Sequence, residues 1–253
     1  MPLQIPGKFT WFEHLGADPG KAREFYEALF GWKVKSVQGA DRGYDMVHNA
    51  GEGIAGLLAA PPRTPNQWIG YLSVPDVDTS FKSALAAGAR PLMEPRDFAG
   101  VGRGATIADP TGAVLSLWKG AQGDREDRDH TPAGDWVWHE LLTPDPAAAV
   151  AFYEKVFGFT HDEMAMGSRG SYFILKGADG KGRAGVTKSQ EGAASMWVPY
   201  VHVEQADATA ARVAPLGGTL VMPPQDIPTI GRIAMLRDPL GAAIAFIQPA
   251  VRA

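Results

Sequence analysis

The sequence predicts an α+β protein made of four βαβββ modules, paired into two similar domains. The stretch from Trp11 to Trp32 returns as Trp138 to Phe159, so that Asp18 maps to Asp145 with an offset of 127 residues (145 − 18). A second series that starts at Trp68 returns from Trp197 with an offset of 129 (197 − 68). A self-match of this length indicates that one supersecondary unit is used repeatedly.

The first module reads as a strand, a helix and three strands. Alternating residues over 8–15 predict the first strand. Asp18-Pro19 can start a helix, because Asp accepts from free backbone N–H groups and Pro needs no donor at the first helical position. An apolar stripe follows, and Gly31 fits a left-handed stop. Three further strands are expected at 33–37, 44–49 and 53–59.

The second module repeats this order more weakly. We expect a strand over 68–74, a helix over 78–87 and strands near 90–93, 104–109 and 113–119. The tetrapeptide Asp109-Pro-Thr-Gly112 is typical of a hairpin turn, and Asp238-Pro-Leu-Gly241 repeats it. Residues 120–134 carry mixed charge and almost no apolar side chains. The expected division is a first domain over 1–119, a linker over 120–134 and a second domain over 135–253.

The composition excludes several classes of partner and of catalytic chemistry. The 253 residues carry a formal net charge of −4, which argues against non-specific partners such as nucleic acid or an anionic membrane. Cysteine is absent, so thiolate catalysis and zinc–thiolate sites are excluded. The N-terminus has no basic and apolar signal pattern, and no run approaches the roughly 20 apolar residues of a membrane span. The expected location is cytoplasmic.

The repeated Asp-Pro helix start, the Phe-Tyr pair before Phe-Gly, and the Asp-Pro-x-Gly turn resemble the vicinal oxygen chelate superfamily. This superfamily includes glyoxalases, bleomycin-resistance proteins and extradiol dioxygenases. The resemblance covers nearly the whole chain outside the linker. It implies curved mixed sheets that enclose a cavity, with helices outside. It also implies a divalent metal held by His, Glu or Gln on the first and last strands of each module, acting as a Lewis acid.

The usual ligand positions of that family hold different chemistry in this chain. Alignment on the landmarks places Trp11, Ile69 and Ser116 there in the first half, and Trp138, Val198 and Ala245 in the second. A shift of two residues gives Glu13, Tyr71 and Trp118, or Glu140, Tyr200 and Ile247. One carboxylate per set is too few for a metal site. A divalent metal is therefore not supported by the ligand pattern, and the cofactor is left unknown.

Glu13 and Glu140 are predicted to face the cavity. A buried carboxylate needs a partner or a raised pKa. Arg103 and Arg232 each follow a glycine in an expected loop, so we predict the ion pairs Glu13–Arg103 and Glu140–Arg232, or the same pairs with the arginines exchanged. These pairs either fix the loops or, with Arg as a fork, bind an anionic oxygen.

His202 is predicted to share the cavity face with Tyr200. With Glu140 it could form a base and its orienting carboxylate, or provide two metal ligands, or only hydrogen-bond in the cavity wall. The candidate catalytic residues are therefore His202, Glu140 and Arg232. His14 and His139 are expected to point away from the cavity. The remaining candidate substrate-binding residues are aromatic or charged: Trp138, Tyr200, Trp11, Glu13, Tyr71 and Arg103.

Three functions stay open at this point. The first is a protein that binds, or also transforms, a small oxygen-rich or aromatic compound between paired modules. If it is an enzyme, the resemblance implies a lyase or oxidoreductase. The second is metal-free sequestration of a ligand, in the manner of bleomycin-resistance proteins, with a homodimer as one arrangement. The third is an interaction scaffold without a small ligand.

Overall fold

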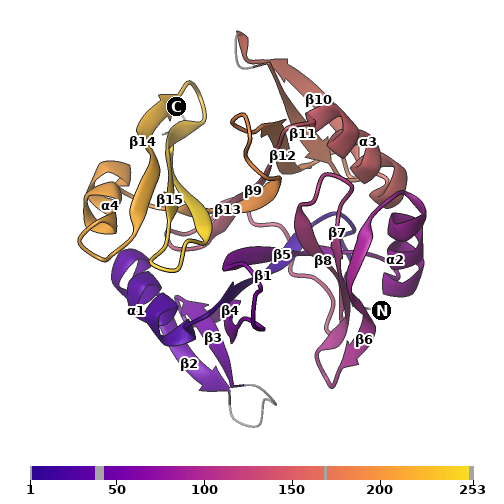
Figure 1. The fold of residues 1–253 in the computed structure, drawn as a ribbon, viewed down its shortest axis with the longest axis horizontal. Coiled ribbons are helices and arrows are strands. Elements are labelled where there is room, and N and C mark those ends of the chain that lie inside the picture. Colours follow the sequence, from indigo (N-terminus) through magenta and orange to yellow (C-terminus); the bar gives the residue numbers. More distant parts are fainter. Residues whose placement is uncertain (1, 38–42, 168–169, 251–253) are drawn as a thin grey trace. The chain divides into compact units, whose positions relative to one another are not determined.

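A computed structural model describes residues 2–37, 43–167 and 170–250. In the first half, the elements follow in the order β1 (Phe9–Gly16), α1 (Pro19–Phe30), β2 (Lys33–Val37), β3 (Tyr44–Asn49), β4 (Glu52–Ala59), β5 (Gln67–Ser73), α2 (Val77–Ala86), β6 (Arg90–Phe98), β7 (Gly102–Ala108) and β8 (Val114–Gly120). In the second half they are β9 (Trp136–Thr143), α3 (Pro146–Phe157), β10 (Thr160–Ala165), β11 (Ser171–Lys176), β12 (Gly182–Lys188), β13 (Met196–His202), α4 (Ala206–Val213), β14 (Thr219–Ile227), β15 (Gly231–Arg237) and β16 (Ala243–Pro249) (Figure 1).

The strands form two eight-stranded sheets of the same topology. Their orders are β2-β3-β4-β1-β5-β8-β7-β6 and β10-β11-β12-β9-β13-β16-β15-β14. β1 runs parallel to β4 and β5 runs parallel to β8, whereas the hairpin neighbours are antiparallel. The predicted α+β class with four βαβββ modules is confirmed. Within the described residues, no helix has the length and apolar character needed to cross a membrane.

β6 is longer than the sequence predicts. We expected a strand over 90–93, but β6 continues to Phe98 across Pro95. It lies at the edge of its sheet, where a missing backbone donor costs no ladder bond. The pairing with β7 shifts register on both sides of Met93, next to Pro91 and Pro95, so the strand accommodates both prolines.

Each sheet lies within one half of the sequence, but the compact units combine segments of both halves. The first unit contains residues 1–11, 69–127 and 138–197, and so carries α2 and α3. The second contains residues 12–68, 128–137 and 198–253, and so carries α1 and α4.

Helices α1 and α3 begin and end as their sequences predict. The Asp18 carboxylate accepts from the Lys21 backbone N–H at 3.0 Å. Asp145 accepts from Ala148 at 3.0 Å. Gly31 and Gly158 end the helices with φ of 74° and 71°, the left-handed region that glycine enters without a steric penalty.

A buried Asp–Tyr–His cluster links the two sequence halves within the second unit. Asp238 lies in the Asp-Pro-x-Gly turn and accepts from Tyr26 Oη of α1 at 2.9 Å. His14 Nε2 lies 2.7 Å from the same carboxylate oxygen, and both side chains are fully buried. Trp68 Nε1 donates to Tyr26 Oη at 2.8 Å. The other oxygen of Asp238 accepts from the backbone of its own turn, at Leu240 and Ala242.

The first unit contains the repeat counterpart of this cluster. Tyr153 of α3 donates to Asp109 at 2.8 Å, and Trp197 Nε1 donates to Tyr153 at 3.0 Å. His139 packs against Phe9 and Trp197, with ring centroids 4.3 and 4.7 Å away. Burial lowers the pKa of His139 to about 3, so the ring is neutral at pH 7.

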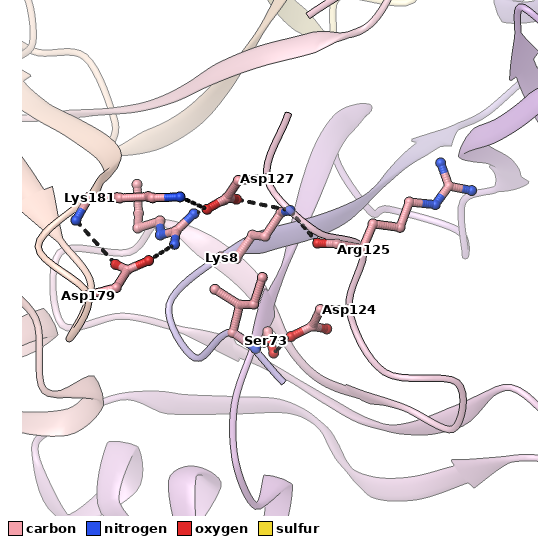
Figure 2. Close-up of polar contacts among 9 residues, drawn as sticks. Lys8, Ser73, Asp124, Arg125, Asp127, Asp179 and Lys181 are labelled. Atoms are coloured by element: carbon pink, nitrogen blue, oxygen red, sulfur yellow. Dashed lines mark hydrogen bonds and ion pairs between the residues drawn. The ribbon is translucent and has the colours of Figure 1, made fainter. Parts of the chain in front are cut away.

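Residues 121–135 form neither helix nor strand, and their first part is fastened within the first unit (Figure 2). The Asp124 carboxylate accepts from Ser73 Oγ and from the Ile5 backbone, both at 2.6 Å. Asp127 meets three cations, namely Arg183 at 2.8 Å, Lys181 at 3.0 Å and Lys8 at 3.1 Å. These contacts, with that of Arg183 the largest, hold the pKa of Asp127 well below its ordinary value. The first part of the predicted linker is therefore anchored to the first unit.

The second part of the linker is anchored within the second unit. Trp32 Nε1 donates to the Gly134 carbonyl at 2.7 Å. Arg128 pairs with Glu52 and, at 3.3 Å, with Asp135. The Asn49 amide donates to the Ala133 carbonyl at 2.9 Å.

Asp238→Asn is expected to destabilise the protein by about 3 kcal/mol, because it removes one partner of a buried pair and keeps the oxygen that the turn requires. Urea unfolding of the variant measures this change. The matched control is Asp226→Asn, whose side chain is 79% exposed in its ion pair and should cost under about 1 kcal/mol. Equal effects of the two substitutions would contradict the role given to Asp238.

The same pair predicts a pH dependence. Burial alone would raise the pKa of Asp238, but the His14 hydrogen bond and charge, with the Tyr26 hydrogen bond, lower it below its ordinary value. A lowered pKa means that the stabilisation is present above the unfolded value of about 3.9 and is lost as the pH falls through the folded value. The stability difference between wild type and Asp238→Asn should therefore shrink below about pH 4.

Candidate functional site

The strand register separates the two faces of each sheet. In β9, His139 and Leu141 face the side on which α3 packs, where Leu141 shares a core with Tyr153. Trp138 and Glu140 alternate with them and so lie on the other side, which we call the helix-free face. β1 repeats this pattern, with His14 against Tyr26 of α1 and Glu13 on the helix-free face. His14 and His139 therefore point toward the helix side, as predicted.

Glu13 and Glu140 are buried on this face, with exposures of 9% and 8%. Each is the cross-strand neighbour of a glycine, namely Gly56 for Glu13 and Gly185 for Glu140. A glycine beside a buried carboxylate leaves room for another group to approach it.

Tyr172 fills the space above Gly185 and connects Trp138 to Glu140. Trp138 Nε1 donates to Tyr172 Oη at 2.9 Å. An indole N–H can only donate, so the tyrosine oxygen accepts and its own proton points to the Glu140 carboxylate, with which it is hydrogen-bonded. Burial, then the Glu140 charge, raises the pKa of Tyr172 far above its ordinary value. We call Trp138, Tyr172 and Glu140 the Trp–Tyr–Glu wall.

The first half repeats the glycine and tyrosine of this arrangement. A Cβ placed on Gly56 would stand 2.1 Å from Tyr44 Oη, and a Cβ on Gly185 would stand 2.0 Å from Tyr172 Oη. Tyr44 and Tyr172 are 128 residues apart (172 − 44), so they are repeat counterparts. The sequence reasoning missed both tyrosines and both glycines, although their recurrence next to Glu13 and Glu140 was a readable signal.

The predicted Glu–Arg pairs are wrong. Arg103 lies inside β7, not in a loop, and its guanidinium binds Asp78 of α2 at 2.7 and 2.8 Å and Asp97 at 2.9 Å. The reason is alternation, because Arg103 shares a face with Ala105 and Ile107 of the helix-side core.

Arg232 repeats this arrangement in β15. Its guanidinium binds Asp207 of α4 at 2.8 and 2.9 Å and Asp226 at 3.1 Å. Both arginines thus tie a helix and an edge strand to the sheet.

His202 ends β13 and is held by the linker. Its Nδ1 lies 2.6 Å from the Thr131 carbonyl, which can only accept, so Nδ1 carries the hydrogen. In the neutral ring Nε2 then keeps its lone pair, the form required of a base or a metal ligand. His130 approaches it edge-on, with ring centroids 6.1 Å apart. His202 and Glu140 belong to different compact units, and their joint action stays a prediction.

The predicted aromatic residues lie in strands near these groups. Tyr71 and Tyr200 are buried and are cross-strand neighbours of Ser116 and Ala245. Tyr71 packs edge-to-face on Trp118, with centroids 5.6 Å apart. Trp11 occupies β1 at the position that Trp138 occupies in β9.

The positions that the landmark alignment predicts for the family's metal ligands carry poor donors. Ile69, Val198 and Ala245 are buried aliphatic side chains, and Ser116 is hydrogen-bonded to Thr106 at 2.9 Å. Within the residues that the structure describes, no three His, Asp or Glu side chains form a group suited to a metal ion. The side chains at these predicted positions do not fit the family's metal site, and the absence of a metal from this chain stays a prediction.

Comparison with known protein families and proteins supports the fold described above. Residues 135–246 match the Glyoxalase/Bleomycin resistance protein/Dioxygenase superfamily, and residues 14–118 match a Glyoxalase-like domain. CFP32 of Mycobacterium bovis, a candidate glyoxylase by its name, is 36% identical over 96% of this chain and 95% of its own length. The anthracycline biosynthesis protein DnrV of Streptomyces peucetius is 31% identical over 96% and 94%. The chain therefore belongs to the glyoxalase/bleomycin resistance protein/dioxygenase superfamily, the vicinal oxygen chelate fold.

Solved structures show the same fold at lower identity. The Mn(II)-bound glyoxalase from Novosphingobium aromaticivorans superposes with a TM-score of 0.65 at 16% identity, over 98% of this chain and 83% of that one. Homoprotocatechuate 2,3-dioxygenase from Arthrobacter globiformis gives 0.64 at 16% identity, over 98% and 81%.

Gly185→Ala is expected to displace Tyr172 and break the Trp–Tyr–Glu wall, at a cost of about 1–3 kcal/mol for overpacking. Tryptophan emission should change, because Trp138 loses its acceptor, and urea unfolding gives the stability. Gly182→Ala on the same strand is the control. Its Cβ would meet Ile174 at 3.1 Å and Trp138 at 3.4 Å, which are longer distances than the 2.0 Å from a Gly185 Cβ to Tyr172 Oη, so its effects should be smaller. Wild-type emission and stability in Gly185→Ala would rule out the described packing.

Proposed function

We propose that this protein binds a small, oxygen-rich aromatic compound at the Trp–Tyr–Glu wall, without a metal ion at the family's usual ligand positions. The observation that supports the proposal is the hydrogen-bond chain from Trp138 through Tyr172 to Glu140. It places an aromatic surface and an acceptor-only carboxylate next to each other on the helix-free face.

The chemistry of the wall defines the ligand. Tyr172 donates to Glu140 and thereby orients a carboxylate that is only 8% exposed. A carboxylate has several acceptor positions, so a ligand hydroxyl could donate to it as well, in a charge-assisted hydrogen bond. The half-buried Trp138 ring can stack on an aromatic ligand. The ligand is therefore a phenol or a related hydroxylated aromatic compound.

The names of two of the relatives agree with this chemistry. Two Streptomyces relatives are named as anthracycline biosynthesis proteins, at 29% and 31% identity over nearly their whole lengths. Anthracyclines are polycyclic aromatic compounds rich in hydroxyl and carbonyl oxygens. An aromatic oxygen-rich ligand thus suits both the wall and these relatives.

Binding of 2-naphthol tests the proposal, because it offers one aromatic ring system and one hydroxyl donor. Calorimetric titration should show Glu140→Gln binding roughly tenfold more weakly than wild type, since a hydrogen bond to a charged group is lost. 2-Methoxynaphthalene, which has no donor, should bind weakly to both proteins. Glu191→Gln, an exposed loop change of the same charge, is the control. Equal affinities of Glu140→Gln and Glu191→Gln would refute the assignment.

A metal-dependent reaction is the competing candidate. The Mn(II)-bound glyoxalase has the same fold, and the tautomer of His202 leaves Nε2 free to act as ligand or base. Equilibrium dialysis of tag-free protein against Mn²⁺ separates the two. Stoichiometric Mn²⁺ binding that is lost in His202→Ala would favour the metal-dependent reaction and contradict the metal-free proposal.

A further inference from the structure

The helix-free face of β5, β6, β7 and β8 carries a second aromatic surface, which belongs to the same compact unit as the Trp–Tyr–Glu wall but is built from other residues. Trp118 lies between Tyr71 and Phe98, with ring centroids 5.6 and 5.5 Å away. Trp118 and Phe98 are both half-buried, so part of each ring remains exposed. We call Tyr71, Phe98 and Trp118, together with Arg96, the β6–β8 platform.

Two glycines allow Trp118 to lie against the neighbouring strand. A Cβ on Gly104 would stand 2.9 Å from the indole ring, and a Cβ on Gly102 would stand 2.7 Å from it. Gly104 is also the cross-strand neighbour of both Trp118 and Arg96. Without side chains at these positions, β7 provides a floor on which the indole rests.

Arg96 supplies a positive charge at this surface. Its guanidinium carbon stands 4.6 Å from the centre of the Phe98 ring, a cation–π contact. Stacking uses the flat face of a guanidinium and leaves its N–H edge able to bind an anion. Across the described segments, no carboxylate pairs with Arg96, in contrast to Arg103 on the opposite face.

The other half of the chain serves as an internal reference. With the offset of 129, the positions of Arg96, Phe98, Gly104 and Trp118 correspond to Gln225, Ile227, Ile233 and Ile247. The same strand pairing connects them, because Ile233 pairs with Ile247 as Gly104 pairs with Trp118. The fold therefore needs neither the aromatic rings nor the glycine nor the cation at these positions. Of the platform residues only Tyr71 has its counterpart, Tyr200, so Arg96, Phe98 and Trp118 are a property of the first half alone.

We propose that the β6–β8 platform is a binding site for a planar aromatic anion, such as an aromatic carboxylate. The ring system would stack on Trp118 beside the Arg96–Phe98 pair, and the anionic group would lie at the N–H edge of Arg96. Both surfaces belong to the first compact unit, but the charged group of the platform is a cation, whereas that of the Trp–Tyr–Glu wall is a carboxylate.

The test is calorimetric titration of the full-length protein with 2-naphthoate and with its neutral analogue 2-naphthalenemethanol. Arg96→Gln copies the residue of the second half and should weaken 2-naphthoate about two- to fivefold, as expected for an exposed cation. It should leave 2-naphthalenemethanol unchanged. Trp118→Ile, also a copy of the second half, should weaken both compounds at least about tenfold.

Matched variants distinguish binding at the platform from non-specific attraction to surface arginines and from binding at the Trp–Tyr–Glu wall. Arg90→Gln removes an exposed arginine from the same strand and should leave 2-naphthoate affinity at the wild-type value. Glu140→Gln should also leave it unchanged, although it weakens 2-naphthol. If Trp118→Ile does not fold, the comparison of Arg96→Gln with Arg90→Gln still decides. No binding of 2-naphthoate at millimolar concentration, or equal affinities in these two arginine variants, overturns the proposal.

Discussion

The buried hydrogen bond between a helix tyrosine and an Asp-Pro-x-Gly turn holds each compact unit together. Tyr26 donates to Asp238, and Tyr153 donates to Asp109. Each bond therefore joins the first module of one sequence half to the last module of the other half. A buried aspartate is tolerable only because its oxygens accept from the tyrosine and from its own turn. These bonds fix the helices on one side of the sheets and leave the opposite side for other chemistry.

The alternation of side chains along the strands then sorts the polar groups. Arginines and aspartates on the helix side, such as Arg103 with Asp78, neutralise each other and serve the fold. On the helix-free side the arrangement differs, since Glu140 is hydrogen-bonded to Tyr172, and Arg96 has an aromatic ring as its neighbour. Strand parity, rather than distance along the chain, decides which charges are available to a ligand.

Duplication made this contrast visible. The Glu–Gly–Tyr arrangement occurs in both halves, at Glu13, Gly56 and Tyr44 and again at Glu140, Gly185 and Tyr172. Arg96, Phe98 and Trp118 of the β6–β8 platform occur in one half only. A repeated feature can serve the fold, a ligand or both, whereas a feature that the other copy lacks without loss of the fold points to a specific role. The positions predicted for the family's metal, by contrast, hold the buried side chains of Ile69, Val198 and Ala245, which offer no donor atom.

The sequence by itself determined the fold class, the repeat, the boundaries of α1 and α3 and the burial of Glu13 and Glu140, because periodicity and capping are local properties. It could not determine the partners of those glutamates. Whether an arginine in β6 or β7 faces the helix-free side depends on the register of its strand, because a shift of one residue moves the side chain to the other face. The strand predicted over 90–93 also ended too early to include Arg96, which lies in β6. Tyr172 reaches Glu140 only because β12 places Gly185 between them. Those contacts join residues distant in sequence, and only the tertiary structure decided them.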